Sequence, residues 1–422
     1  MQKRKNLLKT ILALLLFALS AYAEACSTNN RYWVAANDGT EKVWHDNANW
    51  SCTNNGPGGA STPNQQNKTA IFNSNSSVNV KLNANVPKIY KLNLISGYSG
   101  TINLNGYDLK TKNNMLINYG TVLVPANSTF QSYKDLYIGA NGTVTASGDG
   151  NVISVKNNLK IYGTLTAPSG GGDRFFVRGG FNLYSGGYFD HSSGTVTLNT
   201  RYNNGRRGSC SGKPSAAINI QDGPGVGRNF YNLKKTATKN IYLAKDIEIE
   251  NDLSIIGQGY IYASTCGGTS RNITIGGDWS QLYSSSFKAR SGKVIFNGTS
   301  AQNIDSRSSF NHLQISNSDV SLLSAATVSG TLTIDSGAKL DINGYNLTAG
   351  TLANDGNLQL KGSETLSITT KDTNSGTITY DGSENDLEYG NAYYNLAINS
   401  PSGTMTLDAD LDVNGSLTIT DG

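Results

Sequence analysis

A strand motif that begins with glycine recurs about every twenty residues along this chain. It reads Gly-Thr followed by an apolar residue at positions 100–102, 120–122, 142–144 and 163–165, and it returns at positions 330–332, 376–378 and 403–405. A fixed period of this size is typical of solenoids, in which one coil cannot bury its apolar side chains alone and neighbouring coils cover them. The repeat therefore predicts an all-β fold of stacked coils.

The composition and the residue patterns agree with this fold. Only 37% of the residues are hydrophobic, whereas 47 are glycine and 22 are tyrosine. This hydrophobic fraction is low for a compact globular protein of this length, but a solenoid coil needs only a few inward side chains. From residue 68 onward, apolar and polar residues alternate without a helical period, as in residues 78–82 and 247–250. We expect a parallel β-helix, or β-solenoid, of coils about 20 residues long and roughly 17 in number.

A second, longer repeat overlies the short one. An aromatic-x-Asn/His-Leu element occurs at residues 230–233, 310–313 and 393–396, and each copy follows a strand that starts with glycine. The spacing predicts that about four coils form one long unit that was duplicated. His312 stands where the other copies have asparagine, so we interpret it as a repeat position rather than a catalytic group.

The first 23 residues have the features of a secretory signal peptide. Four basic residues between positions 3 and 9 precede an apolar run at 11–21, and residues 21–23 read Ala-Tyr-Ala, a small-x-small cleavage motif. The run is too short to span a bilayer, and no later stretch is longer, so we expect no transmembrane helix after cleavage. The mature protein is therefore predicted to be secreted or displayed on the cell surface.

Removal of the signal peptide changes the charge of the chain. The full sequence has a formal net charge of +4 and 15% charged residues, and four of its basic residues belong to the signal peptide. The mature chain is close to neutral and lacks the basic surface that nucleic acids require. We therefore expect no nucleic-acid partner.

Four cysteines remain after cleavage: Cys26, Cys52, Cys210 and Cys266. An even number in an exported chain is compatible with two disulfides, for which three connectivities are open. Closeness in sequence favours Cys26–Cys52 and Cys210–Cys266. An alternative is that Cys26 is a lipidated N-terminus, although the preceding Ala-Glu-Ala is a poor match to a lipoprotein signal.

Residues 24–67 form a distinct N-terminal segment of a hairpin and a loop. It holds three of the four tryptophans, Trp33, Trp44 and Trp50. These side chains are candidates for a sugar-binding platform. The favoured alternative is a cap whose indoles cover the open end of the first coil, which protects exposed strand edges.

Residues 68–422 are assigned to the β-helix repeats. The last strand matches residues 330–334, where the pattern continues into a further coil, whereas here the chain stops in mid-repeat. We expect a fragment of a longer gene product, with further repeats or a sorting domain downstream.

Residues 170–213 break the coil period and hold the best catalytic candidates, Asp173, Arg174, Arg178 and Asp190. Glycan-cleaving enzymes use paired carboxylates, or an acidic residue with a basic residue that abstracts a proton. Here the charges are mixed with glycine and asparagine, as in a solvated loop. No strong catalytic motif is present in the sequence, so we predict no enzymatic activity, no cofactor and no metal site.

Residues 292–350 resemble the repeats of large bacterial surface proteins, and residues 31–51 resemble their starts. These proteins include adhesins of the filamentous-haemagglutinin and autotransporter kinds, and giant secreted proteins of Bacteroidetes-like bacteria. The resemblance covers most of the mature chain. It implies a right-handed β-helix and a location at the cell surface, and it transfers no functional residues.

Three functions remain open. The leading one is a non-enzymatic, adhesin-like or structural rod that presents binding surface to glycans or to surface proteins. The first alternative is a secreted polysaccharide lyase or hydrolase of the pectate-lyase-like type. The second alternative is a passive spacer or matrix component of a larger protein.

Overall fold

The computed structural model describes residues 26–95, 97–199, 217–220, 229–265, 268–283, 287–383, 387–400, 407 and 409–421. The fold is all-β, with 48% strand and 1% helix, and parallel coils stack as a β-solenoid of about 15 turns over these residues. The predicted fold class is therefore confirmed. None of the described residues belongs to a helix that is long and apolar enough to cross a membrane. The expected signal peptide, residues 1–23, lies outside the described residues.

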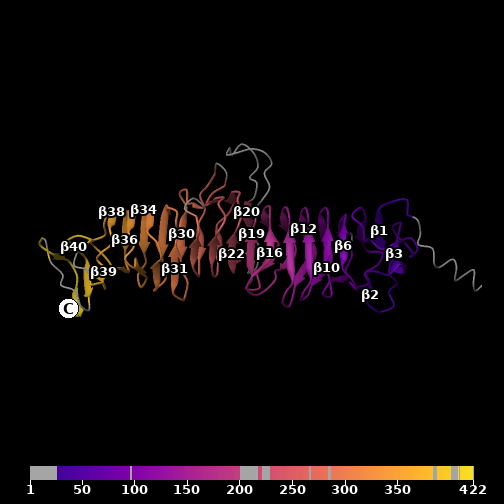
Figure 1. Ribbon diagram of the computed structural model, residues 1–422, viewed down its shortest axis with the longest axis horizontal. Helices are drawn as coiled ribbons and strands as arrows, with labels where there is room; N and C mark the ends of the chain where they lie inside the picture. The colour runs from indigo at the N-terminus through magenta and orange to yellow at the C-terminus, as the bar shows by residue number, and fades with distance from the viewer. Residues whose placement is uncertain are drawn as a thin grey trace, which may run out of the picture. The chain divides into compact units, whose positions relative to one another are not determined.

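The chain divides into two compact units. Unit 1 contains Met1–Ser169 and Gly186–Asp190, and unit 2 contains Gly170–Ser185 and His191–Gly422. Three rows of parallel strands build unit 1 (Figure 1). The first row contains β1 (Asn30–Trp33), β4 (Thr69–Phe72), β7 (Lys91–Leu94), β10 (Met115–Val124), β12 (Leu136–Ala146) and β14 (Leu159–Ile161). The second row contains β2 (Lys42–Val43), β5 (Val80–Lys81), β8 (Thr101–Asn103), the second halves of β10 and β12, β15 (Thr164–Thr166) and β18 (Tyr188–Asp190). The third row contains β6 (Val86–Ile89), β9 (Leu109–Thr111), β11 (Thr129–Ser132) and β13 (Val152–Val155).

The glycine-led motif marks the corner between two strands of a coil. Thr121 pairs with Thr101 in the coil before and with Thr143 in the coil after, so the motif copies stack in register. A Cβ atom added to Gly142 would lie 1.7 Å from the carbonyl oxygen of Ile117 in the preceding coil. Only glycine allows the two backbones to approach so closely. In the copies that lie within the described residues, the next apolar residue points inward and is buried, as for Val122.

Unit 2 also consists of three main rows. One contains β16 (Asp173–Val177), β19 (Thr195–Leu198), β22 (Asn232–Lys235), β25 (Leu253–Ile255), β28 (Trp279–Gln281), β31 (Gln302–Asp305), β33 (Val320–Leu322), β35 (Lys339–Asp341), β37 (Asn357–Leu360), β39 (Thr377–Tyr380), β41 (Asn395–Asn399) and β43 (Leu417–Asp421). A second contains β17 (Phe181–Leu183), β20 (Ala217–Ile220), β23 (Ile241–Leu243), β26 (Ile261–Tyr262) and β29 (Phe287–Lys288). The third contains β21 (Asn229–Phe230), β24 (Ile247–Ile249), β27 (Ile273–Ile275), β30 (Lys293–Phe296), β32 (His312–Ile315), β34 (Ala326–Ile334), β36 (Leu347–Asn354) and β38 (Leu366–Thr370).

The coils of unit 2 differ in length, which explains why about 15 turns replace the roughly 17 expected. Thr195 of β19 pairs with Asn232 of β22, 37 residues further along the chain. Asp252 and Asp278, at equivalent positions of two neighbouring coils, are 26 residues apart. Insertions at the bends lengthen a coil without adding a turn, since the strands on either side still pair.

The longer repeat also has a structural counterpart. In all three copies the aromatic residue that opens the element is buried, and so is the leucine that closes it. The strand that carries each copy pairs directly with the glycine-led strand before it: β22 with β19, β32 with β30 and β41 with β39. In each copy the backbone N–H of the Asn or His donates to the carbonyl of that leading glycine, at distances of 3.2 to 3.4 Å.

The side chain of His312 accepts the same hydrogen bond as the asparagines that occupy its position in the other two copies. The side-chain oxygen of Asn232 accepts the N–H of Asp252 at 3.1 Å, and that of Asn395 accepts the N–H of Ser416 at 2.9 Å. In the middle copy, Nδ1 of His312 accepts the N–H of Thr331 at 3.2 Å. The ring nitrogen therefore takes the place of an amide oxygen, as expected for a repeat position.

We expect His312→Asn to leave stability almost unchanged and His312→Ala to cost about 1–2 kcal/mol. Asparagine offers the same acceptor to the N–H of Thr331, whereas alanine leaves that donor without it. Urea unfolding followed by circular dichroism compares the two variants with the native chain. Equal losses in both variants would contradict the assignment.

Candidate functional site

Trp33, Trp44 and Trp50 form an interior cluster in the N-terminal segment. Their exposures are 1%, 0% and 0%, and their rings pack around Phe72 with centroid distances of 4.9 to 5.8 Å. The indole N–H of Trp50 donates to the carbonyl of Trp44 at 2.8 Å. Buried rings offer no face to a saccharide, so the sugar-platform interpretation of these three residues is wrong. Their packing against the first coil is that of a cap.

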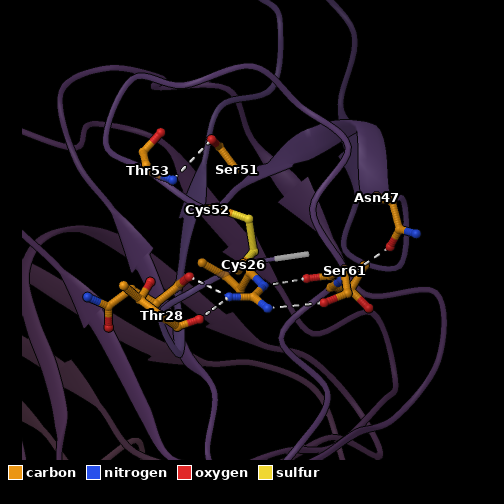
Figure 2. Close-up of a disulfide and its surroundings, with 10 residues drawn as sticks. Cys26, Thr28, Asn47, Ser51, Cys52, Thr53 and Ser61 are labelled. Atoms are coloured by element: carbon orange, nitrogen blue, oxygen red, sulfur yellow. Dashed lines mark hydrogen bonds between the residues drawn. A yellow bond between two sulfur atoms is a disulfide. The ribbon is translucent and has the colours of Figure 1, made fainter. Parts of the chain in front are cut away.

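A disulfide, shown in Figure 2, holds this cap together, and a buried arginine adds hydrogen bonds. Cys26 and Cys52 are bonded, with their Cα atoms 5.2 Å apart, which is the pairing expected from closeness in sequence. Arg31 of β1 is buried, and its guanidinium donates to the carbonyls of Thr28 and Ser61 at 2.9 Å. Since the sulfur of Cys26 is consumed by the disulfide, it is not free to carry a lipid. Cys210 and Cys266 lie outside the described residues.

The first catalytic candidate, Asp173, is committed to a structural ion pair. Its carboxylate accepts from Nζ of Lys234 and from the hydroxyl of Thr197, both at 2.7 Å. Partial burial acts to raise the pKa of Asp173, but these two hydrogen bonds and the charge of Lys234 outweigh it and lower the pKa below its usual value. A carboxylate held in this way is a poor general base.

The other three candidates are assigned to elements as follows. Arg174 belongs to β16 and Arg178 follows that strand in unit 2, whereas Asp190 ends β18 in unit 1. Within unit 2, Asp173 is the only carboxylate among the four, so the facing pair that a glycosidase uses is not formed there from these residues. The part of the chain that the structure describes contains no group of three His, Cys, Asp or Glu side chains placed to hold a metal ion.

The structure reveals a different surface, built on β23, β26 and β29. Tyr242 pairs in register with Tyr262, and Tyr262 pairs with Lys288, so the three side chains form one outward column across three coils. Their chain neighbours Ile241 and Ile261 are buried, and strand alternation then turns the tyrosines outward. The rings of Tyr242 and Tyr262 are stacked, with centroids 4.8 Å apart and planes inclined by 6°. Both side chains are half-buried, with part of their surface open to solvent.

Two cations lie over tyrosine rings at this surface, one over Tyr262 and one over the nearby Tyr260. Nζ of Lys288 is 5.0 Å from the ring centre of Tyr260, and the guanidinium of Arg290 is 5.2 Å from that of Tyr262. Burial raises the pKa of the Tyr262 hydroxyl, the nearby Tyr242 adds to this, Arg290 opposes it and Tyr260 adds to it again. Tyr262 therefore stays protonated at neutral pH and can both donate and accept a hydrogen bond. We name Tyr242, Tyr260, Tyr262, Lys288 and Arg290 the tyrosine–cation cluster.

A hollow of about 280 Å³ adjoins the cluster and shares Lys288 and Arg290 with it. Its lining comes from residues 287–290 in and after β29, from residues 307–311 and from Ser329, and Phe310 among them forms an isolated bridge with Val328. The rings of Phe287 and Phe310, 6.2 Å apart, belong to its lining. We name it the basic hollow, and its lining residues are Phe287, Lys288, Ala289, Arg290, Arg307, Ser308, Ser309, Phe310, Asn311 and Ser329.

The charge of the hollow is of one sign. Lys288, Arg290 and Arg307 line it, and no aspartate or glutamate does. Among the described residues, none of the three takes part in a salt bridge. Arg290 has a φ of 57°, in the left-handed region that a residue with a side chain occupies at a cost of about 1–2 kcal/mol.

This surface combines partly exposed tyrosine side chains with cations that take part in no salt bridge among the described residues. Aromatic side chains and cations of this kind attract saccharides and anions. The composition gives only the total number of tyrosines and does not predict this cluster. The signal was present as Ile-Tyr at residues 241–242 and again at 261–262, one coil further on.

Comparisons of the chain with protein-family models, with curated proteins and with solved structures found no match. The geometry of the fold and of the tyrosine–cation cluster is therefore the basis for assigning a function.

Proposed function

We propose that this protein is a non-enzymatic, exported surface protein that binds glycans through the tyrosine–cation cluster. The observation that carries the proposal is the stacked pair Tyr242 and Tyr262, which presents two aromatic side chains in one outward column. Tyrosine supplies a large contact area with little loss of conformational freedom, and its hydroxyl pairs with polar groups at the rim of the contact. A saccharide has the matching surface, with apolar C–H faces and a rim of hydroxyls.

The regular spacing of the solenoid supports an extended ligand. Coils follow one another at the strand separation of a β-sheet, about 4.8 Å, so Tyr242, Tyr262 and Lys288 form a continuous track. A chain of sugar rings laid along this track contacts successive coils. The predicted signal peptide and the resemblance to bacterial surface repeats both favour display outside the cell.

The alternative of a polysaccharide lyase or hydrolase has less support. Its best candidate, Asp173, is paired with Lys234 and also accepts a hydrogen bond from the hydroxyl of Thr197. The spacer alternative leaves the partly exposed tyrosine–cation cluster without a role, and the cluster is the reason to prefer binding.

The proposal is tested by measuring the binding of the purified mature chain, residues 24–422, to a panel of neutral and acidic polysaccharides by calorimetry. We expect Tyr242→Ala and Tyr262→Ala each to weaken binding about tenfold, because one aromatic contact contributes roughly 1 kcal/mol beyond its buried area. The matched control is Tyr137→Ala, since Tyr137 and Tyr162 form a similar half-buried ring pair 5.1 Å apart in unit 1. It should bind as the native chain does.

Other results would contradict the proposal in different ways. Release of reducing or unsaturated ends from a polysaccharide would indicate an enzyme. A chain that binds no polysaccharide would indicate a spacer. Equal loss of binding in the Tyr137 variant would place the binding surface elsewhere.

A further inference from the structure

We infer that the basic hollow selects anionic polysaccharides by binding an acid group, a uronate carboxylate or a sulfate ester, while the sugar ring rests on the tyrosines. This inference deepens the proposed function and rests on it. The juxtaposition that carries it is the sharing of Lys288 and Arg290 between the tyrosine–cation cluster and the hollow.

The three cations of the hollow lie together without a carboxylate among them. Some outward lysines of other strands are neutralised by a neighbouring carboxylate, as for Lys110 with Asp108 at 2.6 Å and Lys339 with Asp319 at 3.0 Å. Lys288, Arg290 and Arg307 have no such partner in the described part of the chain, although all three are exposed and line one hollow. Like charges gathered without a counter-ion repel one another, and an incoming anion relieves that repulsion.

The hollow also supplies hydrogen-bond donors beside the charges. Asn311, Ser309 and Ser329 are part of its lining, and the side-chain amide of Asn311 lies 3.4 Å from the hydroxyl of Ser329. Guanidinium groups bind planar carboxylates and sulfates through paired N–H bonds, so two arginines suit an acidic substituent better than a neutral hydroxyl.

The backbone at Arg290 points to the same conclusion. Its φ of 57° is one that glycine adopts without strain, yet the chain has arginine there. The side chain is exposed, faces the ring of Tyr262 and lines the hollow. A strained residue whose side chain contributes little to the core is expected where its chemistry serves binding.

The test compares three probes on the native chain and on Arg290→Gly and Arg307→Gln: polygalacturonate, dextran sulfate and neutral dextran. Glycine relieves the strain at position 290, so that variant should fold at least as well as the native chain. We expect the native chain to bind at least one acidic probe tenfold or more tightly than neutral dextran. Each arginine variant should lose about tenfold toward that acidic probe and less than twofold toward dextran. Stronger binding of polygalacturonate or of dextran sulfate identifies carboxylate or sulfate as the preferred group.

The matched control is Lys88→Gln, since Nζ of Lys88 lies 3.7 Å from the ring centre of Tyr133 in unit 1 and is equally a cation on a tyrosine. This variant should keep the acidic preference. Equal affinity of the native chain for acidic and neutral probes overturns the inference and leaves glycan binding intact. Acidic binding that survives both arginine substitutions also overturns it. Failure to bind any probe overturns the proposed function itself.

Discussion

Replacing Trp50 with alanine is expected to destabilise the N-terminal end of unit 1 by about 3–5 kcal/mol. Trp50 is completely buried, and its ring contacts those of Trp33, Trp44 and Phe72 at centroid distances of 5.1, 4.9 and 5.5 Å. Alanine leaves a cavity in this cluster and removes the donor to the carbonyl of Trp44. Because each coil of a solenoid is covered by its neighbour, loss of the cap exposes the first coil to water.

Equilibrium urea unfolding distinguishes the cap from the rest of the protein. Three of the four tryptophans belong to the cap, so tryptophan fluorescence reports mainly on it, while circular dichroism reports on all strands. We expect the fluorescence transition of Trp50→Ala to move to lower urea more than the dichroism transition does. Trp50→Phe is the control, since it retains an aromatic ring and loses only the N–H donor, at about 1 kcal/mol. A loss of less than about 1 kcal/mol in the alanine variant would show that the cluster does not hold the cap.

The second prediction concerns a lysine buried in the core of unit 2. Lys235 of β22 has no exposed surface, and its register neighbours are Leu198 and Ile255. Its Nζ donates to the carbonyls of Ala237 and Gly257 at 2.9 and 3.1 Å. Burial lowers the pKa of Lys235 from 10.5 to about 8, because the charged form is poorly solvated there.

This shift predicts that stability rises with pH over a defined window. Between pH 8 and 10.5 the unfolded chain keeps the proton of Lys235 while the folded chain releases it, so raising the pH favours folding. Below pH 8 the full cost of burying the charge is present, about 3 kcal/mol. From pH 7 to 9.5 the free energy of unfolding should increase by about 2 kcal/mol relative to a chain without this lysine.

Urea unfolding of the native chain and of Lys235→Met at pH 7, 8 and 9.5 measures this difference. The range ends at 9.5 because burial raises the pKa of Tyr393 to about 12 and that of Tyr380 still higher, so these groups destabilise the fold at more alkaline pH. Lys234→Met is the control, since Lys234 lies next to Lys235 in β22 but is paired at the surface with Asp173. A stability difference between native and Lys235→Met that stays constant from pH 7 to 9.5 would contradict the prediction.

Most of the fold could be predicted from local patterns. The spacing of the glycine-led motif gives the coil length, because a glycine is needed wherever one corner packs on the carbonyl of the coil before, as Gly142 does on Ile117. The longer repeat predicted that His312 replaces an asparagine, and its bond to Thr331 shows why this exchange works. The number of turns was overestimated, since insertions lengthen a coil without leaving a regular trace in the sequence.

The candidate site was the part that sequence patterns placed wrongly. Trp33, Trp44 and Trp50 are candidate sugar contacts only because of their residue type. Indoles near the end of a solenoid serve equally well as a buried cap. Asp173 is a candidate because it lies where the coil period breaks, and only the tertiary structure shows that Thr197 and Lys234, from the two following coils, hold its carboxylate.

Local patterns were enough to predict that the chain forms parallel stacked coils and which strand residues point inward. These features depend on alternation and on glycine spacing, which are local properties of the chain. Only the three-dimensional structure shows that Tyr242, Tyr262 and Lys288 share one column, and that Arg290 and Arg307 line one hollow. Residues from different coils meet only through the register between strands, and coils of unequal length make that register unreadable from spacing alone.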